Sequence, residues 1–267
     1  MKALWHFAHS TLRHRDLLRA LVLRELASKY RGSFIGTAWI VLSPLLMLLV
    51  YFFVFHQIFG VRWTSNGTMH DFLPMLYCGL LLHGFLAESL SRCTPVVFKN
   101  APYVKKVIFP LEILPVSLVA TAFIQLVIGL LLLVAILVAL GRSIPPTIVF
   151  LPLIIAPLFI ITIGLSWIVA AMGVFFRDLE HVIGYVMSIL LFLSPIFYPA
   201  SSAPALAQEF LAVNPLSYPI EELRNIAVLG HTPDWSALLF YMIAAIVIVI
   251  VGASVFNSTK NFFADVV

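Results

Sequence analysis

Long runs of apolar residues alternate along this chain with short segments that carry charges, proline or glycine. A helix needs about 20 apolar residues to cross about 30 Å of hydrocarbon, at a rise of about 1.5 Å per residue. The runs meet this length and lack the alternation of apolar and polar residues that marks barrel strands. Their backbone N–H and C=O groups must therefore form hydrogen bonds within helices. The pattern predicts an all-α integral membrane protein with six transmembrane helices, near residues 35–59, 72–91, 116–140, 147–176, 182–198 and 237–256.

Composition supports this prediction and divides the chain into two parts. Hydrophobic residues make up 62% of the 267 positions and charged residues 10%, whereas a soluble domain carries about 25% charged residues. Residues 1–34 are basic, and the apolar run that follows is too long for the core of a signal peptide, so we expect a retained cytoplasmic segment. Residues 35–267 form the expected transmembrane domain. The only cysteines, Cys78 and Cys93, lack metal-ligand spacing and are expected to be buried, inert thiols.

The basic residues predict the orientation in the membrane. With six spans both termini lie on one side, and 13 of the 16 Lys and Arg residues fall on that side. Cytoplasmic segments of membrane proteins are enriched in Lys and Arg, so both termini are expected in the cytoplasm. The net charge of +4 thus reflects topology and contact with membrane lipids, and does not indicate a nucleic-acid partner.

The predicted spans contain almost no ionisable side chains. Glu88 is the only acidic or basic residue within them, accompanied by His56 and His83. An ion-coupled carrier needs such groups near the middle of the bilayer, so we interpret Glu88 as a residue that faces a cavity or the interface. The chain also lacks the G-x-x-x-x-G-K-[ST] loop that binds ATP phosphates. These features leave a passive pore, a membrane enzyme, or one subunit of a machine that is powered elsewhere.

The N-terminal segment has the pattern of an amphipathic helix. Its apolar residues fall on one arc with charged residues opposite, as expected for a helix lying in the membrane interface. These apolar residues are Leu17, Leu18, Leu21, Val22 and Leu26. Glu25 lies within this apolar arc. An acidic side chain there is unfavourable against lipid and is easier to explain if the same face also contacts protein. Simple anchoring at the membrane surface is the other interpretation.

Residues 99–110 are expected to form a short helix in the second connection. Asn100 is placed to cap this helix, Pro102 suits its first turn, and Pro110 ends it. A short capped helix on the cytoplasmic side is suited to docking a partner protein. A surface helix whose charges meet phospholipid headgroups fits the same pattern, and the sequence does not separate the two.

Several short motifs occur in a fixed order relative to the predicted spans. They are residues 24–26 and 29–33 with Gly36, residues 43–45 with 51–55, residues 105–110 with 113–115, and residues 175–179, 194–199 and 214–216. In this order, and over nearly the whole chain, they resemble ABC-2 type transport permeases that export lipid-linked polysaccharides such as O-antigen and teichoic acid. The resemblance implies a transporter subunit without enzymatic activity, located in the bacterial cytoplasmic (inner) membrane.

The resemblance also implies partners. It predicts a homodimer around a central channel, with each subunit resting on a separate P-loop ATPase that binds ATP and Mg, so no cofactor is expected in this chain. The amphipathic N-terminal helix and the helix over residues 99–109 would contact that ATPase. The expected docking residues are Glu25, Lys99, Tyr103, Lys105, Lys106 and Phe109.

Residues 199–236 resemble the extracytoplasmic gate of the family, two short helices that dip back into the membrane. Ser217 and Pro219 predict the start of the second helix, and Gly230 predicts its end. Re-entrant backbone needs shelter from protein or from a water-filled cavity, and a loop lying on the surface is the alternative. The residues expected in the gate are Asn214, Glu221, Glu222 and Arg224.

Aromatic and basic residues indicate how a lipid-linked sugar chain would be handled. Aromatic faces can stack on sugar rings, although an aromatic belt or bundle packing accounts for the same residues. The expected channel-lining residues are Tyr51, Phe55, Phe59, Phe192, Phe197 and Tyr198. A lipid-pyrophosphate carrier would need cations at the cytoplasmic surface, where Arg24, Lys29 and Arg31 are expected, and positive-inside anchoring explains these cations equally.

Two other functions stay open from the sequence. An ABC-2 permease for a drug or another lipid would have the same spans and motifs. A membrane-embedded transferase acting on lipid-linked sugars would need clustered catalytic acids, histidines or a metal site at a membrane face. The candidate acids form no recognisable catalytic spacing, and they are Asp71, Glu209, Glu221, Glu222 and Asp234.

Overall fold

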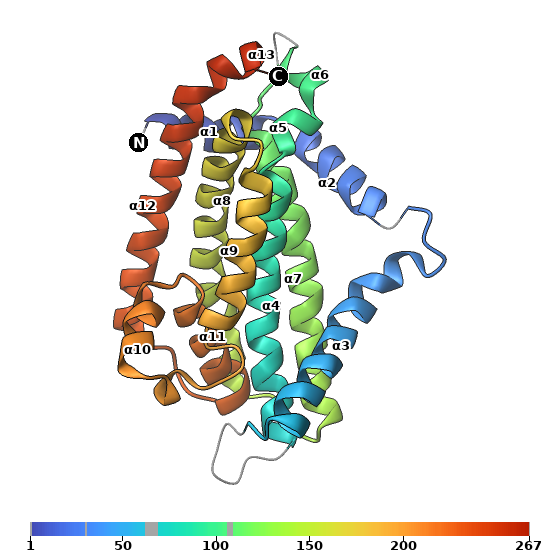
Figure 1. The fold of residues 1–267 in the computed structure, drawn as a ribbon, viewed down its shortest axis with the longest axis vertical. Coiled ribbons are helices and arrows are strands. Elements are labelled where there is room, and N and C mark those ends of the chain that lie inside the picture. The colour runs from blue at the N-terminus through green and yellow to red at the C-terminus, as the bar shows by residue number, and fades with distance from the viewer. Residues whose placement is uncertain (1, 30, 62–68, 106–108, 267) are drawn as a thin grey trace.

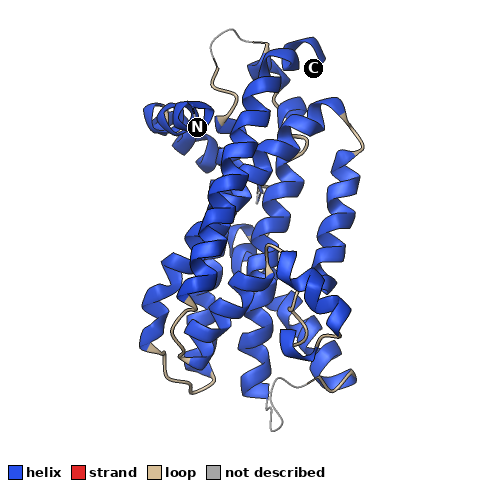
Figure 2. Ribbon diagram, turned by 90° about the vertical axis from the view of Figure 1, so that its left-hand side faces the viewer, coloured by secondary structure: helices blue, strands red, loops and turns tan. Residues whose placement is uncertain are grey.

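The structure is a computed structural model, and it describes residues 2–29, 31–61, 69–105 and 109–266. All regular secondary structure in these residues is helical, which confirms the all-α prediction. Figure 2 shows the longer helices running along the long axis of the molecule. The described chain is therefore a helical bundle with short helices at both of its ends.

Five helical segments of the described chain are long and apolar enough to cross a membrane. Their main helices are α3 (Trp39–Phe52) with the π-helix η2 (Phe53–Ile58), α4 (Met69–Cys93), α7 (Ile113–Ala139), α8 (Leu151–Phe175) and α12 (Trp235–Thr259). Short helices extend three of them, namely η1 (Gly36–Ala38) before α3, η3 (Pro146–Phe150) before α8, and η6 (Lys260–Phe262) with α13 (Phe263–Val266) after α12. These segments confirm five of the six predicted spans, and the last one continues further than predicted.

The remaining predicted span is a shorter helix, α9 (Leu179–Leu193). The helix differs from the predicted bounds 182–198 at both ends, because it starts earlier and because Ser194, which precedes a proline, has extended backbone (φ −88°, ψ 155°). Its 15 residues extend about 22 Å, which is less than the hydrocarbon thickness of about 30 Å. α9 nevertheless lies along the bundle beside α4 and α8 (Figure 1).

Two facing glycines set the contact between α8 and α12. A Cβ atom added to Gly252 would collide with the carbonyl oxygen of Gly164, and one added to Gly164 would lie 2.7 Å from the carbonyl oxygen of Ile248. In a membrane, close packing at small residues rather than hydrophobic burial drives helix association. The two glycines therefore let these spans approach backbone to backbone.

The described chain begins with two helices, α1 (Lys2–Arg13) and α2 (Arg15–Lys29). Leu21 and Val22 of α2 are buried and α2 packs on α7, which confirms the predicted apolar face. Phe7 of α1 is fully buried, with its ring 5.1 Å from that of Trp167 and 6.0 Å from that of Phe256. Both N-terminal helices are thus fixed to the bundle by protein contacts.

The connection after α4 forms two helices of one turn each, α5 (Val96–Lys99) and α6 (Ala101–Val104). The prediction that Asn100 caps a single helix here is wrong. Its side-chain amide donates to the carbonyl oxygen of Val96 at 2.8 Å, so it ends α5 instead of starting α6 through its side chain. The prediction for Pro102 in the first turn is confirmed.

Four short helices follow α9 in the described chain, namely the 3-10 helix η4 (Ala200–Ser202), α10 (Ala205–Val213), α11 (Ser217–Arg224) and the π-helix η5 (Asn225–Leu229). The helix begins at Ser217 as predicted, although the side chain that bonds its first turn is Asn214, whose Oδ1 accepts from the Leu216 amide at 2.9 Å. Gly230 ends η5 with φ +76°, a conformation that favours glycine, and confirms the predicted stop. Figure 1 shows α10 and α11 beside the lower part of α9 and α12.

α3 is the least enclosed of the long helices. Its span is 11% buried, compared with 72% for the span of α4. Figure 1 shows that α3 approaches the bundle at its C-terminal end and diverges from it toward its N-terminal end. This divergence leaves room for a cavity between α3 and the bundle.

Candidate functional site

The six aromatic residues predicted to line a path form one contiguous cluster, which we call the aromatic ladder. Phe197 lies at its centre and is 3% exposed. Its ring stacks on that of Phe55 with a centroid distance of 4.1 Å and an interplanar angle of 11°. The Phe197 ring also lies 5.2 Å from that of Tyr51 and 5.6 Å from that of Phe192. The structure thus joins the first span to the end of α9, two segments far apart in the sequence.

Phe59 and Tyr198 complete the aromatic ladder. The Phe59 ring lies 5.7 Å from that of Phe55, and the Tyr198 hydroxyl donates to the carbonyl oxygen of Phe192 at 3.3 Å. Phe59 and Phe192 are 67% and 57% exposed. The aromatic ladder therefore combines rings that are fixed by packing with rings whose faces are open to a ligand.

The local sequence explains why three of these rings share a side. Residues four apart lie on one face of a helix, and Tyr51, Phe55 and Phe59 follow this spacing. The chain changes from α-helix to π-helix within this stretch, and the Phe59 amide donates to the carbonyl oxygen of Val54 at 3.0 Å. π-helical turns inside helices occur frequently at functional sites.

A separate, polar site lies at the end of α2. We call its five residues the charge network. Lys29 Nζ lies 2.6 Å from Glu88 Oε1 and donates to Gln125 Oε1 at 2.9 Å. Arg92 lies 2.6 Å from Glu25 Oε2 and 3.5 Å from Glu88 Oε1. These contacts tie α2 to α4 and α7 at one end of the bundle.

The charge network explains why an acid interrupts the apolar face of α2. Glu25 is directed at Arg92 of α4 and also receives Arg24 at 3.1 Å. Arg24 donates in addition to the Tyr103 hydroxyl at 3.3 Å. The three cations predicted for a lipid pyrophosphate therefore differ in their surroundings, since Lys29 and Arg24 each contact a carboxylate and Arg31 is exposed.

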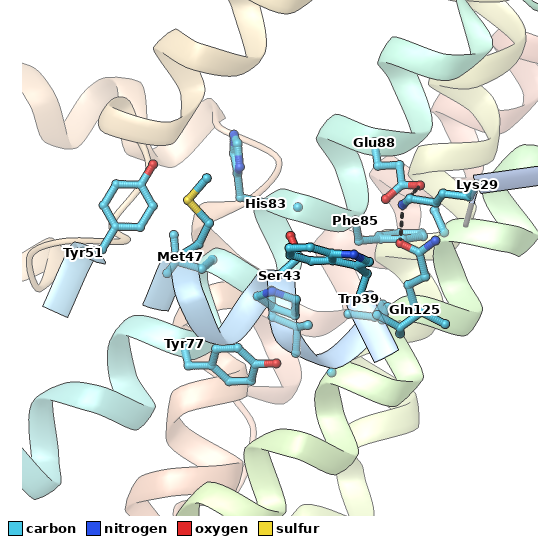
Figure 3. Close-up of a pocket in the computed structure, with 18 of the residues that line it drawn as sticks. Lys29, Trp39, Ser43, Met47, Tyr51, Tyr77, His83, Phe85, Glu88 and Gln125 are labelled. Atoms are coloured by element: carbon cyan, nitrogen blue, oxygen red, sulfur yellow. Dashed lines mark hydrogen bonds and ion pairs between the residues drawn. The ribbon is translucent and has the colours of Figure 1, made fainter. Parts of the chain in front are cut away.

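A cavity of about 660 Å³ extends from the charge network between α3, α4 and α7. Lys29, Glu88 and Gln125 line its polar end, and Figure 3 shows these three side chains meeting beside Phe85. Apolar and aromatic residues line the remainder, including Trp39, Met47, Tyr51, Tyr77, Leu80, Leu81 and Leu126. The cavity is therefore amphipathic, and Glu88 faces it as the sequence analysis expected.

Four of the six residues expected to dock an ATPase lie in α5 and α6 or close to them. The rings of Tyr103 and Phe109 stack at 4.7 Å, Lys105 is exposed, and Lys99 lies 4.0 Å from Glu180 at the start of α9. Arg177, just before α9, lies over the Phe98 ring at 5.3 Å. Lys106 lies outside the residues that the structure describes, and Glu25 is part of the charge network.

Arg224, predicted in the gate, is 3% exposed. Its Nε donates to the carbonyl oxygen of Met75 at 2.9 Å, and its terminal nitrogen donates to that of Ile196 at 3.1 Å. Glu221 lies 3.7 Å away. Asn214 donates to the hydroxyl of Ser194 at 2.8 Å. The expected gate segment is therefore bonded to α4 and to the end of α9.

Two carboxylates hold the chain between η5 and α12. Glu222 accepts from the side-chain amide of Asn225 at 3.2 Å and from the backbone amide of Asp234 at 3.3 Å. Burial raises the pKa of Glu222 above its ordinary value, and these hydrogen bonds oppose the shift. Asp234 caps α12, and hydrogen bonds from the Ser236 side chain and the Ala237 amide lower its pKa.

Four of the five acids considered for a transferase, all except the exposed Glu209 of α10, have such structural partners instead of forming a catalytic group. Asp71, at the start of α4, lies 3.1 Å from Arg142, which follows α7. Asp234 and Glu222 make the bonds given above, and Glu221 lies near Arg224. These contacts give each of the four acids a role in joining elements of the fold.

Sequence reasoning missed the partners that build these sites. Arg92 and Arg142 were used only for topology, and Gln125 was not singled out although it is an amide within an otherwise apolar span. A polar residue in a span is a signal for a polar partner or cavity. Lys29 lies 96 residues from Gln125 along the chain, however, and Glu25 lies 67 residues from Arg92, and single-residue patterns carry no information on such pairs.

Comparisons with known proteins agree over almost the whole chain. The family model described as ABC-2 type transporter matches residues 16–228. The O-antigen export system permease protein RfbA of Myxococcus xanthus is 29% identical over 254 residues, covering 94% of this chain and 95% of that protein. A protein of the same name from Klebsiella pneumoniae is 27% identical over 94% and 95% of the two chains. The polysialic acid transport protein KpsM of Escherichia coli is 23% identical over 91% and 93%.

Proposed function

The chain belongs to the ABC-2 type transporter family, and from this premise we propose that it is the permease subunit of an exporter for a lipid-linked, O-antigen-like polysaccharide. A separate ATPase subunit, which holds ATP and Mg, would power the movement across the bacterial inner membrane. Similarity to permeases named for polysaccharide transport extends over more than nine-tenths of each protein, and this observation carries the proposal.

The aromatic ladder supports a sugar chain as the cargo. Phe59 and Phe192 present exposed ring faces, and Phe197, whose ring stacks on that of Phe55, is fixed by packing. Stacked rings attract the apolar faces of successive sugars without the directional hydrogen bonds that would hold a single unit tightly. Such a surface suits the passage of many similar units, which a polysaccharide exporter requires.

A homodimer would place this surface in a channel. The aromatic ladder lies on α3 with its extension η2 and at the end of α9, and both segments carry many exposed apolar side chains. In a single subunit the aromatic ladder would line only one side of a channel for the sugar chain. Two copies of the chain facing each other through α3 and α9 would enclose it from both sides, as a channel needs.

Six crossings fit the bundle better than five. The start of α9 contacts α5 through Lys99 and Glu180, and its other end contacts the expected gate through Ser194 and Asn214. The helix therefore connects the two ends of the molecule although it is short. Residues 194–198 would complete the crossing, with the carbonyl of Ile196 sheltered by Arg224. Both termini would then face the cytoplasm.

The segment from α10 to η5 is proposed as the re-entrant extracytoplasmic gate. Non-helical backbone within the membrane must be covered by protein or water, and α11 packs against α4 and α8. Asn214 and Arg224 bond it to neighbouring elements, while Glu221 and Glu222 lie beside Arg224 and Asp234. Opening of this segment would release the cargo on the outer side.

The ATPase is proposed to dock on the end of the bundle that carries α2, α5 and α6. Tyr103, Phe109, Lys99 and Lys105 would make direct contacts, together with Lys106. Glu25 would act through its contact with Arg92, because this pair joins α2 to α4 and so passes movement of the docked surface into the bundle.

The pyrophosphate of a lipid carrier is proposed to meet the cations of this same end. Arg31 is exposed, and Arg24 keeps 45% of its side chain accessible. An arginine fork binds phosphate oxygens in pairs. Lys29 contributes less in this proposal because Glu88 already balances its charge at 2.6 Å.

Gentle affinity purification from the native membrane tests the proposal. We expect an ATPase to co-purify in roughly equimolar amount and the eluate to hydrolyse ATP. Lys105→Glu reverses an exposed charge on the docking end and should lower ATPase recovery. Glu209→Lys reverses an exposed charge on α10, at the other end, and should leave recovery unchanged. Purification of the unmodified chain without any ATPase contradicts the proposed function.

A further inference from the structure

The cavity between α3, α4 and α7 has the dimensions of one membrane leaflet. Its lining on α4 runs from Glu88 to Tyr77, which is about 16 Å at 1.5 Å per residue. Half of a hydrocarbon core of about 30 Å is about 15 Å. A site of this length, with charges at one end and apolar residues along the rest, matches the distribution of polarity in one lipid molecule.

Charge at the polar end restricts the kind of lipid. One cation, Lys29, and one anion, Glu88, line this end 2.6 Å apart. A purely anionic headgroup would place its charge against Glu88, and a purely cationic one would place its charge against Lys29. Lys29 and Glu88 already balance each other, so a headgroup that carries one charge of each sign adds no net charge and can place its cation beside Glu88 and its anion on the side of Lys29 and Gln125.

Unfilled hydrogen-bonding positions favour an ammonium and a phosphate. Within the described residues, the side-chain amide nitrogen of Gln125 is buried without a hydrogen-bond partner, and it can donate to a phosphate oxygen. Among the described residues, Lys29 and Arg92 both contact Glu88 through Oε1, which leaves Oε2 to accept from an ammonium N–H. Gln125 and Glu88 thus complement the two halves of one zwitterionic headgroup.

The middle of the cavity offers a further polar contact. Tyr77 is 1% exposed and lines the cavity, and its hydroxyl has no hydrogen-bond partner among the described residues. Glycerol ester groups lie below the headgroup of a phospholipid and accept hydrogen bonds. Beyond them, Leu80, Leu81 and Leu126 provide an apolar surface for an acyl chain.

We propose that this cavity binds one zwitterionic phospholipid of the phosphatidylethanolamine type in each subunit, with its headgroup at Glu88, Lys29 and Gln125. The lipid fills the space that α3 leaves as it diverges from the bundle (Figure 1). Its presence holds α3 at a fixed distance from α4 and α7. The inference is independent of the cargo and requires only that the bundle lies in a membrane.

The chain offers a variant that fills the cavity without distorting the fold. Gly84 lines the cavity, and a Cβ atom added there meets nothing within 4 Å. Gly84→Leu therefore projects a side chain into the lipid site. Gly184 of α9 has the same open surroundings and does not line the cavity, so Gly184→Leu is the matched control. Gln125→Leu removes the proposed phosphate donor.

Native mass spectrometry of the delipidated protein in mild detergent tests the proposal. The probes are dioleoyl phosphatidylethanolamine, phosphatidylcholine and phosphatidylglycerol. We expect one phosphatidylethanolamine per subunit, bound at least about fivefold more tightly than the other two, because phosphatidylcholine lacks N–H donors and phosphatidylglycerol lacks the cation. Gly84→Leu should lose this lipid, Gly184→Leu should keep it, and Gln125→Leu should bind it several-fold more weakly.

Two results overturn the proposal. One is equal binding of the three lipids, and the other is unchanged binding of phosphatidylethanolamine by both Gly84→Leu and Gln125→Leu. Thermal unfolding of each variant, followed by reaction of the buried thiols of Cys78 and Cys93, identifies any variant that is misfolded. If Gly84→Leu is misfolded, Gln125→Leu decides alone, since its side chain keeps a similar size.

Discussion

Arg224 is an almost fully buried cation whose bonds join three parts of the chain. It reaches the carbonyl oxygens of Met75 in α4 and Ile196 after α9, and it starts from α11. Hydrogen bonds from a charged donor contribute about 1.5–3 kcal/mol each, and removing the donor leaves its acceptors unpaired. This one side chain therefore fixes the expected gate to the spans.

Arg224→Met should lower the free energy of unfolding by about 2–3 kcal/mol, because Ile196 loses its charged donor in a buried place. The expected drop in Tm is roughly 4–12 °C. Thermal unfolding followed by labelling of the buried thiols of Cys78 and Cys93 measures it. Lys99→Met, which removes an exposed ion pair 4.0 Å long, should change Tm by less than about 3 °C. Equal Tm values for the two variants would refute the role given to Arg224.

The exposed rings of the aromatic ladder give a second prediction at this scale. Phe192→Ala should leave Tm nearly unchanged, since the ring is 57% exposed, and should lower polysaccharide export several-fold. Phe192→Tyr should keep export because it keeps the ring face. Leu131→Ala removes a side chain of similar exposure, 66%, outside the ladder, and serves as the control. Export that is unaffected by Phe192→Ala argues against cargo contact at this ring.

Helices of this chain were predictable where one physical requirement fixed them. Apolar runs of about 20 residues identified α3, α4, α7, α8 and α12, because backbone N–H and C=O groups in lipid must find their hydrogen-bond partners within the same segment. The prediction failed at α9, where the proline after Ser194 ends the helix early. It failed again at Asn100, whose side chain bonds backward to Val96, since capping depends on a local geometry that the residue type alone does not determine.

The contact between α8 and α12 is the most sensitive element pairing in the bundle. Gly252→Leu would drive a side chain into the backbone of Gly164, so the spans must separate, and we expect a loss of about 3 kcal/mol or more. The yield of folded protein in detergent, measured by size-exclusion chromatography, should fall sharply. Ser254→Leu, at an exposed position two residues further along α12, should behave as wild type. A normal yield of Gly252→Leu would show that the two helices pack differently.

At the scale of the whole molecule, the two chain ends lie at the same end of the bundle (Figure 1). The proposed six crossings, made by the five long helices together with α9, would produce this arrangement, because an even number of crossings returns the chain to the side on which it began. The sequence predicted the side from its basic residues. Which residues meet across the bundle, such as Phe55 with Phe197 or Lys29 with Glu88, could not be predicted, because pairing depends on tertiary packing of distant segments.

A C-terminal reporter tests the topology. Six crossings with a cytoplasmic N-terminus predict a cytoplasmic C-terminus, so fused green fluorescent protein should be fluorescent there and fused alkaline phosphatase should be inactive. The same reporters placed after Ser202, in the connection that follows α9, should give the opposite pattern. An active phosphatase at the C-terminus would mean that α9 does not cross the membrane.

Depletion of this chain in its native bacterium tests the central claim most directly. Surface polysaccharide and the intracellular pool of lipid-linked glycan are measured together, before depletion and after the chain is restored. An export permease predicts that surface polysaccharide falls while complete lipid-linked glycan accumulates inside the cell, and that both recover on restoration. Surface polysaccharide that stays constant, or that falls without any accumulation of lipid-linked glycan, would contradict a role in export.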